Sequence, residues 1–123
     1  ICQGQWDFCY LLIKANKFGL DFPFPHRSFD LHSVAQVKYF EINGNFSIKE
    51  DKSGMGLTSV LEFCGMMDKR RVIDRKGAII KEGKPHNGLE DAKLEAECFS
   101  RIVFGKNLIE DYARFPIPDY LKK

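Results

Sequence analysis

Several features that mark particular classes of protein are missing from this 123-residue sequence. Its four cysteines form no CxxC pair, which argues against a structural zinc site and, at this length, against a disulfide framework. No apolar run reaches the length of a transmembrane helix, and the first residues lack the basic lead and long apolar core of a signal peptide. The net charge is only +2, so affinity for a polyanion would have to come from local patches.

The remaining composition is that of an ordinary folded domain. Hydrophobic residues make up 44% and charged residues 29% of the chain, and the sequence contains neither internal repeats nor low-complexity tracts. We therefore expect a single domain over residues 1–123, with no membrane segment, in a reducing, cytoplasmic compartment. Three of the cysteines fall on apolar stripes and are expected to be small buried hydrophobes. Because the chain starts at Ile1 and enters a helix almost at once, we expect it to be part of a longer polypeptide.

Helical periodicity dominates the chain. Apolar residues recur every three or four positions in four segments, and a glycine stands where most of these segments would end. A basic turn with a glycine at 75–77 predicts a β-hairpin, residues 27–29 are expected to form a short strand, and the polar stretch 43–56 is typical of a surface loop. The prolines at 22–25 and 115–118 predict extended segments. The expected helices cover residues 7–18, 31–39, 57–64 and 89–103.

The last expected helix carries its apolar residues on one face. Leu89, Ala92, Ala96, Phe99 and Val103 alternate in steps of three and four, and this stripe is expected to pack against the body of the protein. The sequence nevertheless contains no strong central strands on which four helices could rest. The sequence therefore predicts a chain that is rich in helices and poor in strands.

Three side chains at helix entrances form the pattern that carries chemistry. His86 lies in a loop five residues before Asp91, in the first turn of the last helix, and Asp7 opens the first helix. Carboxylates are hard oxygen ligands for Mg²⁺ or Mn²⁺, and two such ions can clamp the attacking and leaving oxygens of a phosphodiester. A histidine near its ordinary pKa is suited to accept the proton of the attacking water.

At these residues the chain resembles the DEDD-type 3′–5′ exonucleases, in the subgroup related to proofreading exonucleases and ribonuclease T that uses a histidine base. His86, four intervening residues and Asp91 are similar to the last motif of that family, and the segment from Gly4 to Phe8 is similar to its middle motif. The order of the segments between them also agrees. The resemblance implies an α/β, ribonuclease-H-like fold, Asp7 and Asp91 as ligands of Mg²⁺ or Mn²⁺, His86 as catalytic base, and the 3′ ends of DNA or RNA as substrate.

One part of that family's pattern is absent. Its first motif, an Asp-x-Glu pair on the first strand, occurs nowhere in the 123 residues. The simplest account is that the N-terminal strands are missing from this chain, which would also explain helices without a sheet. The chain alone is then expected to be a poor metal site and a poor catalyst. The competing interpretation is a non-catalytic nucleic-acid-binding or protein-interaction module on a degenerate exonuclease fold.

Each of these residues also has a plainer interpretation. Asp7 and Asp91 could simply be acids in the first turn of a helix, where they stabilise by about 0.3–1 kcal/mol. Asn87 would then be the helix cap and His86 an ordinary loop residue. Glu90 is expected to be solvated. His26 and His32 have no acidic partners at ligand spacing and are expected to be structural.

The densest basic cluster gives a second candidate site. Lys69, Arg70 and Arg71, followed by Arg75 and Lys76, could follow a phosphate backbone. Runs of charge more often form a solvated loop, so both interpretations stay open. The sequence leaves open whether the chain forms a homodimer.

Overall fold

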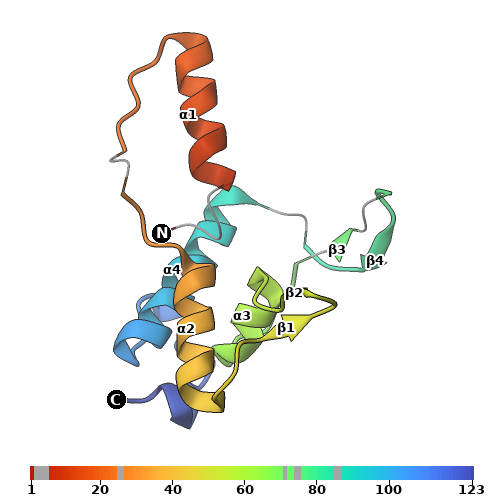
Figure 1. The fold of residues 1–123 in the computed structure, drawn as a ribbon, viewed down its shortest axis with the longest axis vertical. Coiled ribbons are helices and arrows are strands. Elements are labelled where there is room, and N and C mark those ends of the chain that lie inside the picture. Colours follow the sequence, from red (N-terminus) through yellow and green to blue (C-terminus); the bar gives the residue numbers. More distant parts are fainter. Residues whose placement is uncertain (2–5, 25–26, 71, 74–75, 85–86) are drawn as a thin grey trace.

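The computed structural model describes residues 1, 6–24, 27–70, 72–73, 76–84 and 87–123. Within these ranges the chain forms four α-helices, two short antiparallel hairpins and two turns of 3₁₀ helix (Figure 1). The β1–β2 hairpin follows the second helix, and the β3–β4 hairpin precedes the last one. The elements are α1 (Trp6–Phe18), α2 (Leu31–Asn43), β1 (Ile48–Lys49), β2 (Lys52–Ser53), α3 (Leu57–Phe63), β3 (Val72–Ile73), β4 (Ile79–Lys81), α4 (Gly88–Phe104), η1 (Glu110–Tyr112) and η2 (Asp119–Leu121).

Local signals in the sequence set the boundaries of α2. The Asp30 carboxylate accepts hydrogen bonds from the backbone N–H groups of His32 and Ser33, at 3.2 and 3.1 Å, and so caps the first turn. Gly44 ends the helix with φ 74°, a left-handed conformation that favours glycine. The predicted helix is confirmed, although it runs further than expected, to Asn43.

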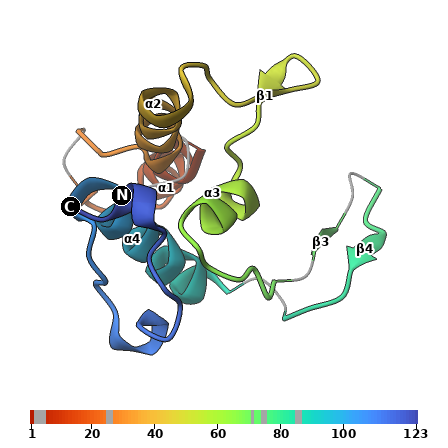
Figure 2. The same ribbon diagram turned by 90° about the horizontal axis from the view of Figure 1, so that it is seen from below.

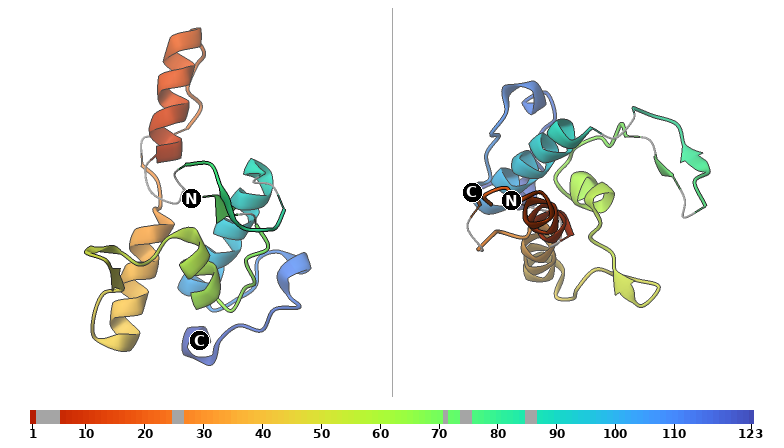
Figure 3. Two further views of the ribbon diagram at one scale, coloured as in Figure 1. Left: turned by 90° about the vertical axis from the view of Figure 1, so that its right-hand side faces the viewer. Right: turned by 90° about the horizontal axis from the view of Figure 1, so that it is seen from above.

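The core lies where α2, α3 and α4 meet. Each of these helices contacts the other two, and the C-terminal segment covers the same core with Tyr112 and Leu121. Helix α1 projects beyond this three-helix body (Figures 1 and 3). The buried apolar residues of the core are Leu31, Ala35, Met55, Val60, Leu61, Cys64, Met66, Cys98, Ile102, Tyr112 and Leu121.

The face of α4 that packs into this core is only partly the predicted one. The expected stripe begins at Leu89, which is 66% exposed, and continues through Ala92, which is also exposed. The buried positions are instead Glu97, Cys98, Arg101 and Ile102. Phe99 of the expected stripe does pack against the core. The prediction missed Cys98 and Ile102, and it missed the buried Glu97–Arg101 ion pair because it counted only apolar residues.

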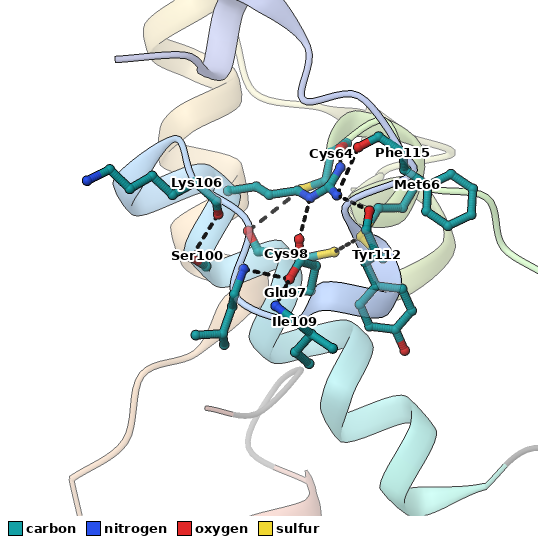
Figure 4. Close-up of polar contacts among 11 residues, drawn as sticks. Cys64, Met66, Glu97, Cys98, Ser100, Lys106, Ile109, Tyr112 and Phe115 are labelled. Carbon is teal, nitrogen blue, oxygen red and sulfur yellow. Dashed lines mark hydrogen bonds and ion pairs between the residues drawn. The ribbon is translucent and has the colours of Figure 1, made fainter.

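That ion pair is completely buried. Arg101 Nε donates to Glu97 Oε1 at 2.8 Å, and both side chains have no exposed surface. The remaining N–H groups of the guanidinium donate to the carbonyls of Cys64, Tyr112 and Phe115 at 2.9–3.1 Å (Figure 4). Glu97 Oε2 accepts the backbone N–H groups that follow α4, at positions 108 and 109. Helix α4 is thereby tied to α3 and to the C-terminal segment.

Three further expectations, about a strand, a loop and a hairpin, can be compared with the structure. Residues 27–29 form no strand, so that prediction was wrong. The stretch 43–56 is only partly irregular, because it contains the β1–β2 hairpin, whose turn places Glu50 and Asp51 at positive φ. The predicted hairpin at 72–80 is confirmed as β3–β4, and it stands away from the helices in Figure 2.

The cysteines are only partly as expected. Cys64 and Cys98 are fully buried free thiols in the core, whereas Cys9 is exposed on α1. The extended segment at 115–118 packs on the core through Phe115 and Ile117, as predicted.

Candidate functional site

The N-terminal end of α4 presents the one predicted site carboxylate whose side chain the structure describes. Asn87 Oδ1 accepts the backbone N–H groups of Leu89 and Glu90 at 3.0 and 3.3 Å, which makes Asn87 the helix cap that the sequence predicts. The first helical hydrogen bond runs from Asp91 N to the Asn87 carbonyl at 2.9 Å. This capped turn places Asp91 at the edge of the body with a half-buried side chain.

Asp91 faces a cavity of about 430 Å³. Three segments meet there, namely residues 66–70 after α3, the first turns of α4 and residues 112–115. The cavity lies within the usual size range of small-molecule sites. Its lining consists of Met66, Met67, Lys69, Arg70, Lys84, Asn87, Glu90, Asp91, Leu94, Tyr112, Arg114 and Phe115.

Arg70 bridges two carboxylates at this cavity. Its Nε and NH2 groups donate to Asp68 Oδ1 and Oδ2, both at 2.9 Å, and NH1 reaches Asp91 Oδ1 at 3.4 Å. Its side chain is only 12% exposed. Arg70 is therefore committed to a bidentate ion pair with Asp68 and to a longer contact with Asp91.

The same contacts control the ionisation of Asp68. Burial by itself would raise the pKa of the Asp68 carboxyl, but hydrogen bonds from Arg70 and from Thr58 Oγ1, together with the charge of Arg70, hold that pKa far below its usual range. Burial would also lower the pKa of Arg70, and the two carboxylates Asp68 and Asp91 raise it instead. This pair is ionised at neutral pH.

Three other cations at the cavity are not engaged in this way. Lys69, Lys84 and Arg114 are all exposed. Among the described residues, none of these three forms an ion pair with a carboxylate. The Arg114 guanidinium instead lies over the Phe115 ring, with 5.0 Å between its carbon and the ring centroid.

The predicted site residues are only partly brought together. Asp91, Lys69 and Arg70 line the same cavity. Asp7 occupies the first turn of α1, but its side chain is not described, and His86 and Arg71 lie outside the described residues. Lys84 and Asn87, the nearest described residues on either side of positions 85–86, both line the cavity. In the described part of the chain, no group of three or more His, Cys, Asp or Glu side chains is arranged to hold a metal.

Two of the remaining interpretations were correct. Glu90 is exposed and pairs with Lys93 at 3.2 Å, so it is solvated as predicted. His32 hydrogen-bonds through Nε2 to Ser53 Oγ at 2.6 Å and joins α2 to the β1–β2 hairpin, a structural role. Its Nδ1 lies 4.0 Å from Asp30 Oδ2, so the expectation that it has no acidic partner was wrong. His26 lies outside the described residues.

Sequence reasoning missed two arginine–carboxylate pairs that shape the site. The Glu97–Arg101 pair has the i, i+4 spacing that a helix supports, so a signal was present in the sequence. The Asp68–Arg70 pair had none, because an acid two residues before an arginine is typical of any loop. Lys84 and Arg114 could not have been grouped with Lys69, since only the folded chain brings these three residues to one cavity.

Comparisons of this chain with protein-family models, curated proteins and solved structures found no match. Over the ranges that the structure describes, none of the helices has the length and apolar character needed to cross a membrane.

Proposed function

We propose that this chain is part of a metal-dependent 3′–5′ exonuclease that hydrolyses phosphodiester bonds at the 3′ ends of DNA or RNA. The observation that carries the proposal is the position of Asp91, the last residue of the His86–Asp91 motif. It lies in a capped first turn of α4, beside a cavity lined by four cationic side chains. A carboxylate next to cations suits a substrate that brings both a metal ion and phosphate groups.

The resemblance gives each residue a role. Asp7 and Asp91 would be ligands for Mg²⁺ or Mn²⁺, and such ions supply charge stabilisation for the phosphoryl group being attacked. The fit of the described residues to a metal is incomplete, because Asp91 contacts Arg70 at 3.4 Å and is the only described carboxylate of the proposed set. His86 would accept the proton of the attacking water.

Exposed apolar surface supports the idea that further strands complete the domain. Leu89 on α4 is 66% exposed, and Phe104 at the other end of that helix is 55% exposed. Between them the Phe99 ring contacts Phe29, whose own exposure is 66%. A surface of this kind usually marks a contact with another part of a protein. We propose that a sheet carrying the Asp-x-Glu motif covers it.

The test is a Mn²⁺ titration of a polypeptide in which strands with an Asp-x-Glu motif precede Ile1. Two bound ions per chain are expected, and Asp91→Asn should weaken at least one of them. Asp111→Asn is the matched control, because Asp111 is an exposed acid in a short helix and is not one of the residues that line the cavity. Equal Mn²⁺ binding by the parent protein and Asp91→Asn would remove Asp91 from the proposed site.

One observation favours a second candidate function, a non-catalytic nucleic-acid-binding module on the same fold. Asp91 is already paired with Arg70, as expected for a carboxylate that no longer holds a metal. In this case the chain would bind single-stranded DNA or RNA equally well with and without divalent ions, and Asp91→Asn would leave that binding unchanged.

We also propose a cytoplasmic location for the protein. Cys64 and Cys98 are free thiols in the core, and cysteines used in this way are typical of reducing compartments.

A further inference from the structure

The cavity beside Asp91 is lined by two chemically different groups of side chains, next to the carboxylates of Glu90 and Asp91. One group is cationic and consists of Lys69, Lys84 and Arg114, which belong to the two ends of the β3–β4 hairpin and to the C-terminal segment. Together they bring three positive charges that, among the described residues, no carboxylate neutralises through an ion pair. Such a concentration of charge in a concave site favours an anionic group, above all a phosphate.

The other group of lining side chains is apolar. Met67, Leu94 and Phe115 supply aliphatic, thioether and aromatic surface to the lining. Met67 is 61% exposed although it is a large hydrophobic residue, so this surface is open to a ligand. Flat aromatic groups pack well on such surfaces, and the bases of nucleotides gain about 1–3 kcal/mol each from aromatic contacts.

The buried arginine contacts explain why the cavity keeps this shape. Arg101 binds the carbonyls of Tyr112 and Phe115 at 2.9 and 3.1 Å, which fixes the C-terminal wall. Arg70 binds Asp68 and Asp91 and joins the opposite wall to α4. The walls are therefore held before any ligand binds, and preformed sites bind small ligands at lower entropic cost.

From these features we infer that the cavity binds a nucleoside monophosphate unit. The phosphate lies against Lys69, Lys84 and Arg114, and the base lies against Met67 and Leu94, beside the Phe115 ring that Arg114 covers. A volume of about 430 Å³ suits a ligand of this size. The inference rests on the proposed function only for the choice of a nucleotide among aromatic phosphate esters. The unit could be a free nucleotide or the terminal residue of a strand, since both present the same groups.

Equilibrium binding of adenosine 5′-monophosphate, measured by calorimetry in EDTA, tests the inference. Lys69→Gln and Arg114→Gln are each expected to weaken binding by roughly tenfold, the effect of losing one charge-assisted hydrogen bond. Both residues are exposed, so neither change should disturb folding. Lys49→Gln is the matched control, because Lys49 is an exposed lysine on the β1–β2 hairpin, outside the cavity lining, and it should bind as the parent protein does.

Three further ligands identify which groups are recognised. Adenosine without its phosphate and inorganic phosphate alone should both bind at least tenfold more weakly than the monophosphate. A short oligonucleotide distinguishes the two sources, since tighter binding of the oligonucleotide assigns the site to strand ends and tighter binding of the monophosphate assigns it to free nucleotide. Absence of saturable binding, or equal affinity for adenosine and its monophosphate, would overturn the inference.

The same experiment separates this inference from the nuclease proposal. Binding in EDTA needs no metal, so saturable nucleotide binding by a protein that lacks any hydrolytic activity would leave the cavity assignment intact and refute the enzyme. Metal-dependent hydrolysis by a protein that binds no nucleotide in EDTA would support the enzyme and refute the cavity assignment.

Discussion

At the scale of single residues, two buried carboxylates organise the molecule, and each is held by an arginine. Glu97 pairs with Arg101 under α4, and Asp68 pairs with Arg70 beside the cavity. Taking charges out of water is costly, and it is tolerated only when all their hydrogen-bonding groups find partners. Both arginines also bind groups on other segments, so each pair connects parts of the chain that are distant in sequence.

We predict that Arg101→Met destabilises the protein by about 3–5 kcal/mol, because it leaves the Glu97 charge buried without its partner. Urea denaturation followed by circular dichroism measures the change in the free energy of unfolding. Lys122→Met is the control, since the Lys122–Asp119 pair is exposed to solvent and a surface pair contributes about 0–1 kcal/mol. The combined change Glu97→Leu and Arg101→Met should cost less than Arg101→Met alone, and a larger loss would contradict this account.

The low pKa of Asp68 predicts a dependence of stability on pH. The carboxyl pKa is depressed in the folded protein, mainly because the hydrogen bonds of Arg70 outweigh the effect of burial. Its contribution to stability is therefore complete above the unfolded pKa of about 3.9 and is lost as the pH falls from there towards the folded pKa. The stability difference between the parent protein and Asp68→Asn should be constant from pH 7 to 5 and shrink below pH 4. A difference that stays constant down to pH 2.5 would show that Asp68 gains nothing from Arg70.

At the scale of the elements, the helix ends and the close contacts of the C-terminal segment determine how the cavity wall is built. Gly65 ends the turn after α3 with φ 71°, and a Cβ placed there would lie 2.7 Å from the carbonyl oxygen of Pro116 and 2.9 Å from Cδ of Pro118. The segment at 115–118 thus packs directly on glycine backbone, and this contact brings Phe115 to the cavity.

We predict that Gly65→Ala is more destabilising than Gly44→Ala. Both glycines have positive φ, but a Cβ at Gly44 would meet nothing within 4 Å. Gly44→Ala therefore reports the backbone cost alone, about 1–2 kcal/mol, and Gly65→Ala should add roughly 1–3 kcal/mol of steric conflict. Thermal unfolding of the two variants measures the difference, and equal losses would mean that the segment at 115–118 does not press on Gly65.

The existence of the four helices could be predicted from the sequence where periodicity, cap and terminal glycine agreed, as they do for α4 between Asn87 and Gly105. The buried face of α4 could not be predicted, because Glu97 and Arg101 are residue types that usually lie on the surface. Their partners are backbone groups of Leu108, Ile109 and Phe115, which only the folded chain brings to them. The cavity was equally out of reach. Its cations lie up to 45 residues apart in the chain, from position 69 to position 114, and no local pattern connects them.

At the scale of the whole molecule, the exposed apolar side chains on α1 and α4 are the most consequential feature. Ile13 is 64% exposed on α1, and Leu89 is 66% exposed on α4. If strands with an Asp-x-Glu motif cover the exposed apolar surface of α4, as we propose, two carboxylates are added to Asp7 and Asp91. Two carboxylates alone cannot hold two divalent ions in the arrangement that phosphodiester hydrolysis requires.

We therefore predict that the 123 residues alone hydrolyse nucleic acid weakly or not at all, and that strands supplied in cis or as a separate fragment restore activity. Shortening of a 5′-labelled single strand in the presence of Mn²⁺ measures both states. Robust hydrolysis by the 123 residues alone would mean that other acids of this chain, such as Glu90 or Asp30, complete the site.

The most direct test of the central claim is the rate of nucleotide release by the strand-completed protein and by its His86→Ala and Asp111→Asn variants, with Mn²⁺ binding measured in parallel. If His86 is the base, His86→Ala should lower turnover by about 10²–10⁴-fold while metal affinity stays nearly unchanged, and Asp111→Asn should behave as the parent protein does. An unaltered rate in His86→Ala, or no metal-dependent release of nucleotides by any of the three proteins, would contradict the claim.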